Sequence, residues 1–411
     1  MTTTNEGSAP TDEAFEAFVL ELGRALHESG VPAYRLEEAL TLVTSLFRRE
    51  AHFFSTPTSL MVSFAPTRTT LLRVVPPPVE LARVARLDAL VRALERGTLS
   101  LDDAPAALRA ITASPLRSSR PVLVAAHGVV AASSAVFLGG SVADAVVAGA
   151  IGVVLGVLAI PLGRDAARAR AVDLVSALVA SLLGHAAARV VGDLGGGVSA
   201  PIATLAGLVA LLPGLTLTTA MTELAMRHLV SGTARLMAAV IVFLELGLGV
   251  AIGERLFALV GESSTTSTHT PLAQTFIPLA LVLIAGSGIA LFHSEWKTFT
   301  RVLAACALAF VGARGGALFF GPELGVFVGA LFLGAFANAL ARVTDTPALV
   351  TQVPAVLLLV PGSLGYKSLA SLVEKDTLAG VETGIAMLFV AIAIVAGLLV
   401  ANALVAPRRM L

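Results

Sequence analysis

The chain has 411 residues, of which 56% are hydrophobic and only 14% are charged, whereas about 25% are charged in an average soluble domain. The net charge is zero and no basic run or basic-aromatic patch occurs, which argues against a nucleic-acid-binding protein. Residues 1–119 hold 12 Lys and Arg and 14 Asp and Glu, while the much longer remainder, residues 120–411, holds only 16 and 14. We therefore predict a soluble N-terminal domain followed by a polytopic α-helical membrane region.

The N-terminal part is predicted to be a compact α+β domain over residues 12–118, after a disordered tail of residues 1–11. The first residues are polar and acidic, so no cleavable signal peptide is expected. Helical periodicity is found over residues 15–30, 36–47 and 81–94. Residues 53–75 alternate instead, with a turn at 65–68, which predicts a two-stranded hairpin. Residues 100–103 form a capping box, which predicts one more short helix.

Ten apolar stretches follow residue 120, each long enough for a bilayer core about 30 Å thick, which requires roughly 20 residues per helix. They lie near residues 121–139, 142–162, 172–191, 200–221, 236–258, 272–292, 302–320, 323–341, 348–367 and 378–405. The polar stretch 261–270 separates them into two sets of five. We predict one membrane repeat over residues 120–262 and a second over residues 271–407.

The basic residues of the loops predict the orientation, because cytoplasmic loops are enriched in Lys and Arg. If the N-terminal domain lies inside, the inner loops hold ten such residues and the outer loops hold five. We therefore predict a multi-pass protein of the cell membrane (plasma or inner membrane), with both termini in the cytoplasm.

An internal repeat supports this division. Two segments align without a gap at an offset of 148 residues. Four proline or glycine positions coincide: Pro213 with Pro361, Gly214 with Gly362, Gly232 with Gly380, and Gly249 with Gly397. Because each half has an odd number of spans, the second half must cross the membrane upside down. Two inverted five-helix repeats are the plan of many secondary transporters.

Both Pro-Gly steps lie inside apolar spans, where a proline removes one helical N–H donor and disturbs the preceding turn. The freed backbone groups need partners, which a substrate or water can supply, although a simple packing kink is the alternative. Hydroxyl groups near a break suit an amino-acid ammonium or hydroxyl group, but threonines also bond to their own helix. The predicted substrate-binding residues are Pro213, Gly214, Thr216, Thr218, Thr219, Glu223, Pro361, Gly362, Ser363 and Tyr366.

Proton coupling is predicted to involve Glu245, which lies about mid-span. A carboxylate there costs several kcal/mol, so the group should face a cavity or be protonated. Desolvation favours the protonated form, which suits a reversible proton carrier. A structural hydrogen bond to a neighbouring helix explains Glu245 equally well. Glu223 and His185 are the other proton-coupling candidates, although a lone buried histidine is more often structural.

No other chemistry is apparent in the sequence. It contains no catalytic set, phosphate loop or Cys/His cluster, so we expect no enzyme, no cofactor and no metal site. The single cysteine, Cys306, lies in an apolar span and is predicted to be a packed small residue. Asn338 and Asn402 are expected to bond between helices. Close helix packing is predicted for glycine pairs four residues apart, namely Gly152/Gly156, Gly249/Gly253, Gly312/Gly316, Gly325/Gly329 and Gly380/Gly384.

Beyond about residue 12 the chain resembles the threonine/serine exporter family over nearly its whole length. In the N-terminal part the resemblance rests on Leu22-Gly23, Ser29-Gly30, Arg35-Leu36-Glu37, Thr56-Pro57-Thr58 and the 60–64 strand. In the membrane part it rests on Pro213-Gly214-Leu215, Glu223-Leu224, residues 231–235, and Val360-Pro361-Gly362-Ser363 with Tyr366. The family often has an Asn and an Arg-Asp pair where this chain has Thr219 and Thr222-Glu223. The acid is kept as a glutamate, but the arginine is missing.

The resemblance implies a fused soluble domain, ten transmembrane helices, and export of threonine and serine driven by the proton gradient. The expected partners are a small amino acid, protons and the lipid bilayer, and glycine-rich helix faces permit a homo-oligomer. One alternative is a transporter of a small (di)carboxylate, for which Arg314 is the main basic candidate. The other is a non-transporting membrane scaffold whose soluble domain binds a partner, but a scaffold has little use for two helix breaks in register.

Overall fold

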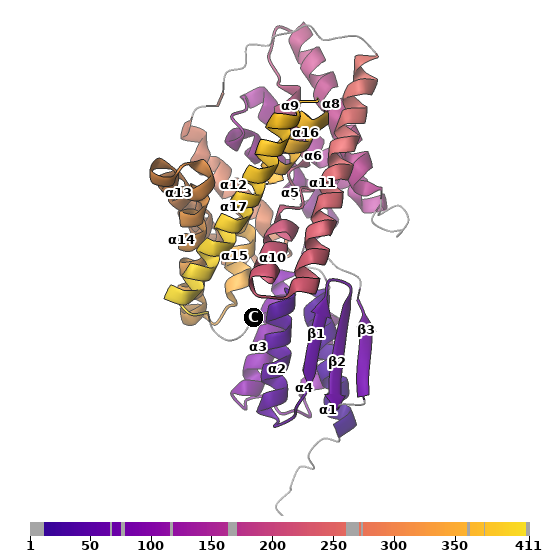
Figure 1. Cartoon of the computed structure of the whole chain (residues 1–411), viewed down its shortest axis with the longest axis vertical. Helices are drawn as coiled ribbons and strands as arrows, with labels where there is room; N and C mark the ends of the chain where they lie inside the picture. The colour runs from indigo at the N-terminus through magenta and orange to yellow at the C-terminus, as the bar shows by residue number, and fades with distance from the viewer. Residues whose placement is uncertain are drawn as a thin grey trace, which may run out of the picture.

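The computed structural model describes residues 12–65, 68–74, 79–115, 118–162, 171–259, 271–272, 274–359, 362–373 and 375–407. Residues 12–112 contain four helices and a three-stranded antiparallel sheet in the order β1-β2-β3, shown in indigo and purple in Figure 1. These elements, together called the N-terminal unit, are α1 Asp12–Glu28, α2 Ala33–Leu46, β1 His52–Thr56, β2 Ser59–Ala65, β3 Arg68–Arg73, α3 Leu81–Glu95 and α4 Ala104–Thr112. Their apolar faces form one buried core that includes Phe18, Leu22, Leu40, Leu60 and Leu87.

The sheet has one strand more than the predicted hairpin. In β1 only Ser55 is buried, so the strand lacks the apolar alternation by which β2 and β3 were predicted. Its pairing with β2 holds it in place, with Phe53 opposite Val62. A side chain from α2 also contributes, because Glu37 Oε1 accepts a hydrogen bond of 2.7 Å from the Ser55 amide. Part of the predicted turn, residues 66–67, lies outside the described residues.

Eight helices in the described part of the chain are long and apolar enough to cross a membrane. They are α5 Arg120–Phe137, α6 Val142–Leu162, α8 Val172–Asp193, α11 Leu229–Ala258, α12 Ile277–Leu291, α13 Phe299–Phe320, α14 Pro322–Thr344 and α17 Thr377–Leu404. The short 3-10 helices η1 Gln274–Phe276 and η2 Trp296–Thr298 lead into α12 and α13. The chain is therefore mostly helical, as a polytopic membrane protein requires.

The other two predicted spans, near residues 200–221 and 348–367, are each a pair of short helices. The first pair is α9 Ala200–Leu208 and α10 Gly214–Ala225, and the second is α15 Ala348–Val356 and α16 Gly362–Val373. At a rise of 1.5 Å per residue, helices of nine or twelve residues are about 14–18 Å long, so none of the four could cross a bilayer core alone. Each break falls at the Pro-Gly step.

The two broken pairs correspond residue by residue. The bounds of α9 and α10, and the first residue of α11, each recur 148 residues later in α15, α16 and α17. The pairs nevertheless run in opposite directions: α10 and α15 lie near the N-terminal unit, and α9 and α16 lie at the far end (Figure 1). Each half-helix also packs across the two halves, because α10 contacts α17 as well as α11, and α16 contacts α11 as well as α17.

The contact between α8 and α11 in the first half resembles the contact between α14 and α17 in the second half. A Cβ atom at Gly249 of α11 would crowd the Leu174 carbonyl oxygen and lie 2.7 Å from Ala177 Cβ of α8. A Cβ atom at Gly397 of α17 would crowd the Phe327 carbonyl oxygen and lie 2.9 Å from Ala330 Cβ of α14. Both glycines therefore allow the same close approach of two helix backbones.

Several sequence predictions about packing are confirmed. Cys306 is fully buried in the core between α12, α13 and α14. Gly312 and Gly329 meet at the contact between α13 and α14, where a Cβ atom on Gly312 would lie 2.9 Å from Gly329 Cα. Asn338 Nδ2 donates a hydrogen bond of 2.8 Å to Asn402 Oδ1, which ties α14 to α17.

Candidate functional site

The two helix breaks lie against each other in the middle of the membrane region. Pro213 precedes α10 with a non-helical ψ of 38°, and the Gly214 amide turns back to the Leu212 carbonyl at 2.8 Å. A Cβ atom at Gly362 would lie 3.0 Å from Leu212 Cβ, so the first break packs directly on the start of α16. The predicted Pro361 lies outside the described residues.

A cavity of about 330 Å³, here called the break cavity, lies between these two breaks and helices α5 and α12. Most of its wall is apolar, and its polar side chains are His127, Ser134 and Ser363. His127 Nδ1 lies 2.8 Å from the Leu123 carbonyl oxygen, which can only accept, so Nδ1 donates this hydrogen bond. Gly362 and Ser363 are therefore the predicted residues that this cavity brings together with the first break.

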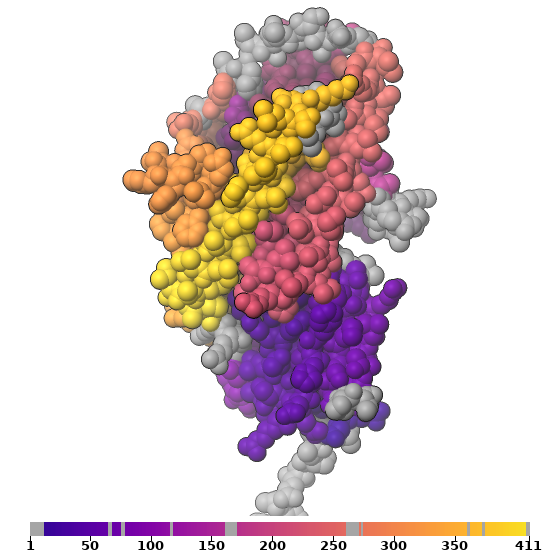
Figure 2. Space-filling view, viewed as in Figure 1, coloured from indigo at the N-terminus to yellow at the C-terminus, as the bar shows by residue number. Residues whose placement is uncertain are grey.

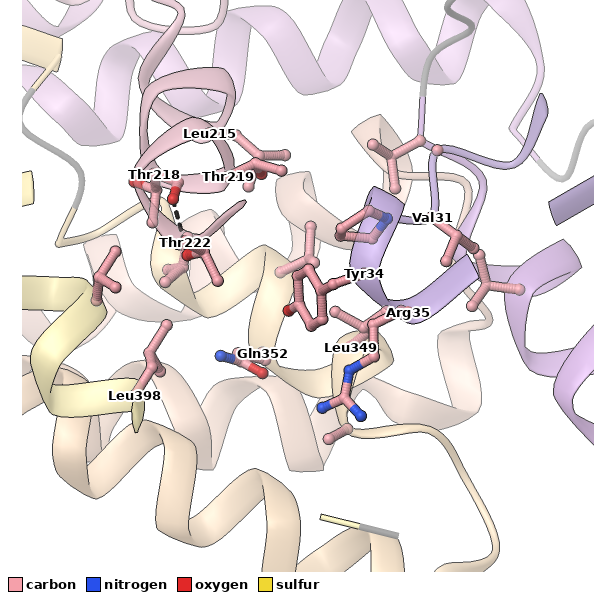
Figure 3. Close-up of a pocket in the computed structure, with 18 of the residues that line it drawn as sticks. Val31, Tyr34, Arg35, Leu215, Thr218, Thr219, Thr222, Leu349, Gln352 and Leu398 are labelled. Atoms are coloured by element: carbon pink, nitrogen blue, oxygen red, sulfur yellow. Dashed lines mark hydrogen bonds between the residues drawn. The ribbon is translucent and has the colours of Figure 1, made fainter. Parts of the chain in front are cut away.

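A second cavity, here called the junction pocket, lies where the N-terminal unit meets α10, α15 and α17. It measures about 90 Å³. Figure 3 shows Tyr34 and Arg35 of α2 on one side and Thr218, Thr219 and Thr222 of α10 on the other, with Gln352 of α15 lower in the view. Thr218 and Thr219 were predicted for the substrate site.

Five further polar lining residues were not predicted for the site, namely Tyr34, Arg35, Thr222, Gln352 and Asn402. Arg35 belongs to the Arg35-Leu36-Glu37 segment on which the family resemblance rests, so a signal existed for it. Nothing in the sequence indicates that α2 reaches the membrane region. Burial raises the pKa of the Tyr34 phenol above its ordinary value, so this hydroxyl stays protonated and can donate a hydrogen bond.

Glu223 lines neither of the two cavities described. Its side chain is completely buried. Oε1 accepts a hydrogen bond of 3.0 Å from the Ala33 amide, and Oε2 accepts one of 2.7 Å from Ser231 Oγ. Arg235 Nε lies 3.1–3.2 Å from both oxygens. Ala33 is the first residue of α2, so the carboxylate also sits at the positive end of a helix dipole.

The N-terminal unit is therefore held to the first half of the membrane region by the hydrogen bond from the Ala33 amide to Glu223, a carboxylate that is itself paired with Arg235. Figure 2 shows the α10 end resting directly on the unit. It is held to the second half by α3, whose first amides at Leu81 and Ala82 donate to the Phe292 and His293 carbonyls at the end of α12. Arg92 Nη1 of α3 also pairs with Asp345 Oδ1 after α14 at 3.2 Å. The unit thus bridges both halves.

The remaining predicted site residues are dispersed. Thr216 lines neither of the two cavities described, and Tyr366 is buried in a core with Ile151 and Leu155. His185 Nδ1 bonds to the Ser181 carbonyl at 2.8 Å, and its ring packs 5.5 Å from Phe257.

Glu245 is half-buried on α11 and close enough to Asp173 of α8 for their charges to interact. It lies ten residues beyond Arg235, which is about 15 Å along the helix. The structure therefore does not bring Glu245, Glu223 and His185 together as one proton site.

Two other sequence expectations bear on alternative chemistry. Arg314, the basic residue considered for a dicarboxylate, is exposed on α13 and lines neither of these two cavities. Among the described residues there is no group of three or more His, Cys, Asp or Glu that could hold a metal ion. The polar groups in the two cavities are instead suited to hydrogen bonding with a small organic molecule.

Comparison with protein families places these features in a known context. A family model described as a threonine/serine exporter matches residues 17–257. A second, described as Threonine/Serine exporter, ThrE, matches residues 279–404.

Curated relatives are similar at lower identity. Pheromone-regulated membrane protein 10 of Pichia sorbitophila is 24% identical over 370 residues, covering 86% of this chain and 36% of the relative. The protein of the same name in Eremothecium gossypii is 26% identical over 420 residues, covering 95% and 56%. The chain thus spans between about a third and just over half of the length of such relatives. No solved structure matches it.

Proposed function

We propose that this chain, which belongs to the threonine/serine exporter family, exports small hydroxylated amino acids from the cytoplasm in exchange for protons. Threonine and serine are the first candidates, because the family description names them. The observation that carries the proposal is the pair of broken helices, equivalent at an offset of 148 residues and opposite in direction, whose breaks meet at a cavity.

The proposed architecture has ten spans in two inverted repeats of five. Each repeat contributes four continuous helices and one broken pair, namely α9–α10 or α15–α16. Transporters of this plan bind substrate near the bilayer midplane, where broken helices leave backbone groups free. Contacts also cross between the halves, because α10 packs on α17 and α16 packs on α11. Each broken pair therefore has a surface of the opposite half along which it can move.

The proposed orientation places the N-terminal unit and both termini in the cytoplasm. The excess of Lys and Arg in the loops on that side supports it. In this orientation the junction pocket lies on the cytoplasmic side of the break cavity, so a substrate to be exported meets the junction pocket first.

The lining residues support a small polar substrate. The break cavity offers the hydroxyl groups of Ser134 and Ser363 and one imidazole among apolar side chains. A hydroxyl group can both donate and accept a hydrogen bond, so it can pair with the hydroxyl, ammonium or carboxylate of an amino acid. A dianion would favour several basic residues, and the described lining of this cavity contains no Lys or Arg.

The proposed proton carrier is Glu245. It is half-buried within α11 and interacts with Asp173 of α8 across the packed α8–α11 pair. A half-buried carboxyl group inside an apolar helix is placed to take up a proton and release it when the two helices change their surroundings.

The test is transport by the purified chain in proteoliposomes. Vesicles loaded with labelled threonine are given a pH gradient, and release is followed with and without an uncoupler. The proposal expects gradient-dependent release that serine competes for and succinate does not. If neither threonine nor serine is released under any gradient, the substrate assignment is wrong. Competition by succinate alone would favour the carboxylate transporter.

A further inference from the structure

The junction pocket contains a guanidinium group with unused hydrogen-bonding capacity. The Arg35 side chain is 12% exposed, and its Nε atom is buried without a hydrogen-bond partner. The nearest carboxylate partner found is Glu38, whose Oε2 lies 3.6 Å from Nη1 and whose own side chain is half exposed. Such an exposed pair contributes little, whereas an unsatisfied buried donor costs about 1–3 kcal/mol. A ligand carboxylate that draws this guanidinium toward it would give Nε a partner and remove this cost.

The opposite wall of the pocket presents acceptors. Thr218 donates its hydroxyl hydrogen to the Gly214 carbonyl at 3.0 Å, and Thr222 donates its own to the Thr218 carbonyl at 2.8 Å. Because each hydroxyl has a single hydrogen, what both oxygens still offer a ligand is their lone pairs. Such lone pairs suit an ammonium group, which only donates.

The pocket therefore has one end that suits an anion and another that suits a cation. Arg35 presents a planar guanidinium, the geometry that recognises a carboxylate. Between the two ends the wall consists of apolar side chains, including Leu215, Leu349 and Leu398. With a volume of about 90 Å³, the pocket suits a ligand with a short side chain.

We propose that the junction pocket is a binding site for a small zwitterionic α-amino acid, with Arg35 holding its carboxylate and the Thr218 and Thr222 oxygens accepting from its ammonium. The proposal rests on the proposed export function and extends it, because it makes the N-terminal unit part of the substrate path. Arg35 lies two residues after Ala33, whose amide is bonded to Glu223. This bond fixes the start of α2, and with it the backbone of Arg35, relative to α10.

The first experiment measures binding to the full chain in lipid nanodiscs by isothermal titration calorimetry. Threonine is compared with threoninamide, which lacks the carboxylate, and with 3-hydroxybutyrate, which lacks the ammonium. We expect both analogues to bind at least tenfold more weakly than threonine. Arg35→Gln should weaken threonine binding at least tenfold, with Arg35→Lys between the two. The matched control is Arg24→Gln, because Arg24 is an exposed arginine on α1.

A second readout does not depend on an affinity change. Cys306 is buried, so Thr219→Cys introduces one reactive thiol at the pocket wall. Threonine, serine, alanine or glycine should slow its modification by a maleimide, and threoninamide should not. Equal protection by threoninamide, or unchanged threonine binding by Arg35→Gln, would overturn the assignment of Arg35.

The outcomes separate this site from the proposed function. If the wild-type chain transports threonine and Arg35→Gln transports it with an unchanged KM, the export function stands and the site is wrong. If glycine or alanine protects the T219C thiol while threonine and serine are not transported, the site stands and the substrate assignment is wrong. If none of the four amino acids protects the thiol in a folded protein, the site is wrong.

Discussion

The half-helices α10 and α16 occupy equivalent places in the two halves of the membrane region, but their surroundings differ. Both have twelve residues, follow a break at a Pro-Gly step and begin with a buried glycine. At the position where α10 has Glu223, α16 has Ser371. Glu223 is buried in an ion pair and bonded to the N-terminal unit, whereas α16 lies at the opposite end of the membrane region (Figure 1).

A similar difference occurs in the helices that follow. Glu245 on α11 corresponds at the same offset to Ala393 on α17. The packing positions are alike in both halves, as Gly249 and Gly397 show, while the carboxyl groups of Glu223 and Glu245 have no acidic counterpart at the equivalent positions of the second half. The comparison indicates that small residues at helix contacts maintain the repeated scaffold. Glu223 and Glu245 make the first half distinct. Glu223 contacts the N-terminal unit, and Glu245 is the proposed proton carrier.

The strongest test of this comparison is Glu223→Ala against Ser371→Ala. Removing the carboxylate leaves the Ala33 amide and Ser231 without a partner and Arg235 without its counter-ion. Breaking a buried pair in this way costs about 3–5 kcal/mol, so we expect a fall of several degrees in the melting temperature. Faster proteolysis of the N-terminal unit should accompany it. Ser371→Ala should change the melting temperature much less. Equal effects would contradict the assigned asymmetry.

Gly249→Ala and Gly397→Ala test the shared scaffold. Each new methyl group would overlap a backbone carbonyl of the neighbouring helix, and such overpacking costs about 1–3 kcal/mol. We expect similar losses of thermal stability from the two variants, because their contacts correspond. Gly315→Ala is the control, since a Cβ atom there would meet nothing within 4 Å. A large effect of only one of the two variants would show that the halves are not packed alike.

Glu245→Gln tests the proposed proton-carrying role of Glu245, whose equivalent in the second half is Ala393. The amide cannot carry a proton, so gradient-driven release of threonine should fall at least tenfold, about 1.4 kcal/mol. Exchange of threonine across the membrane without a pH gradient should continue. Glu382→Gln on the exposed face of α17 is the control. Full gradient-driven transport by Glu245→Gln would remove this residue from the mechanism.

The smallest expected effect is a pH dependence at His293, where the N-terminal unit meets the second half. Its Nδ1 atom accepts a hydrogen bond of 3.3 Å from the Ser118 amide, and burial lowers its pKa below the ordinary value of 6.5. As the pH falls through 6.5, the unfolded chain takes up a proton that the folded chain resists, so stability should decrease below this pH. Thermal unfolding at pH 7.5 and pH 5.5 would measure the change.

His293→Asn should reduce that pH dependence. Asparagine can present an oxygen acceptor to the Ser118 amide, and it tolerates the left-handed backbone of this position, where φ is 48°. An unchanged difference in melting temperature between the two pH values would assign the pH dependence to other groups.

Much of the membrane region could be predicted from the sequence, because the length of an apolar stretch and the presence of a Pro-Gly step are both local features of the chain. Eight of the ten predicted spans correspond to continuous helices, and the other two are interrupted at the Pro-Gly steps. Strand β1 was missed because its side chains are mostly exposed, so pairing with β2 rather than an apolar pattern holds it in place.

The candidate site was less predictable. Thr218, Thr219 and Ser363 line cavities, but Glu223 forms a contact between the N-terminal unit and α10, and its partner Ala33 lies 190 residues away in the chain. Arg35 and Gln352 meet at the junction pocket although they lie more than 300 residues apart. Periodicity and spacing cannot indicate such contacts, since they describe only neighbours along the chain.

The sequence by itself determined where this chain is apolar, where its helices break and that two of its segments match at an offset of 148 residues, because these depend on local composition and backbone chemistry. The tertiary structure decided which buried charge finds a partner and which hydroxyl groups face a cavity. Those outcomes depend on how the N-terminal unit docks across both halves. A buried carboxylate is stabilised by the donors that the fold brings within hydrogen-bonding distance. For Glu223 these are Ala33 on α2 and Ser231 and Arg235 on α11.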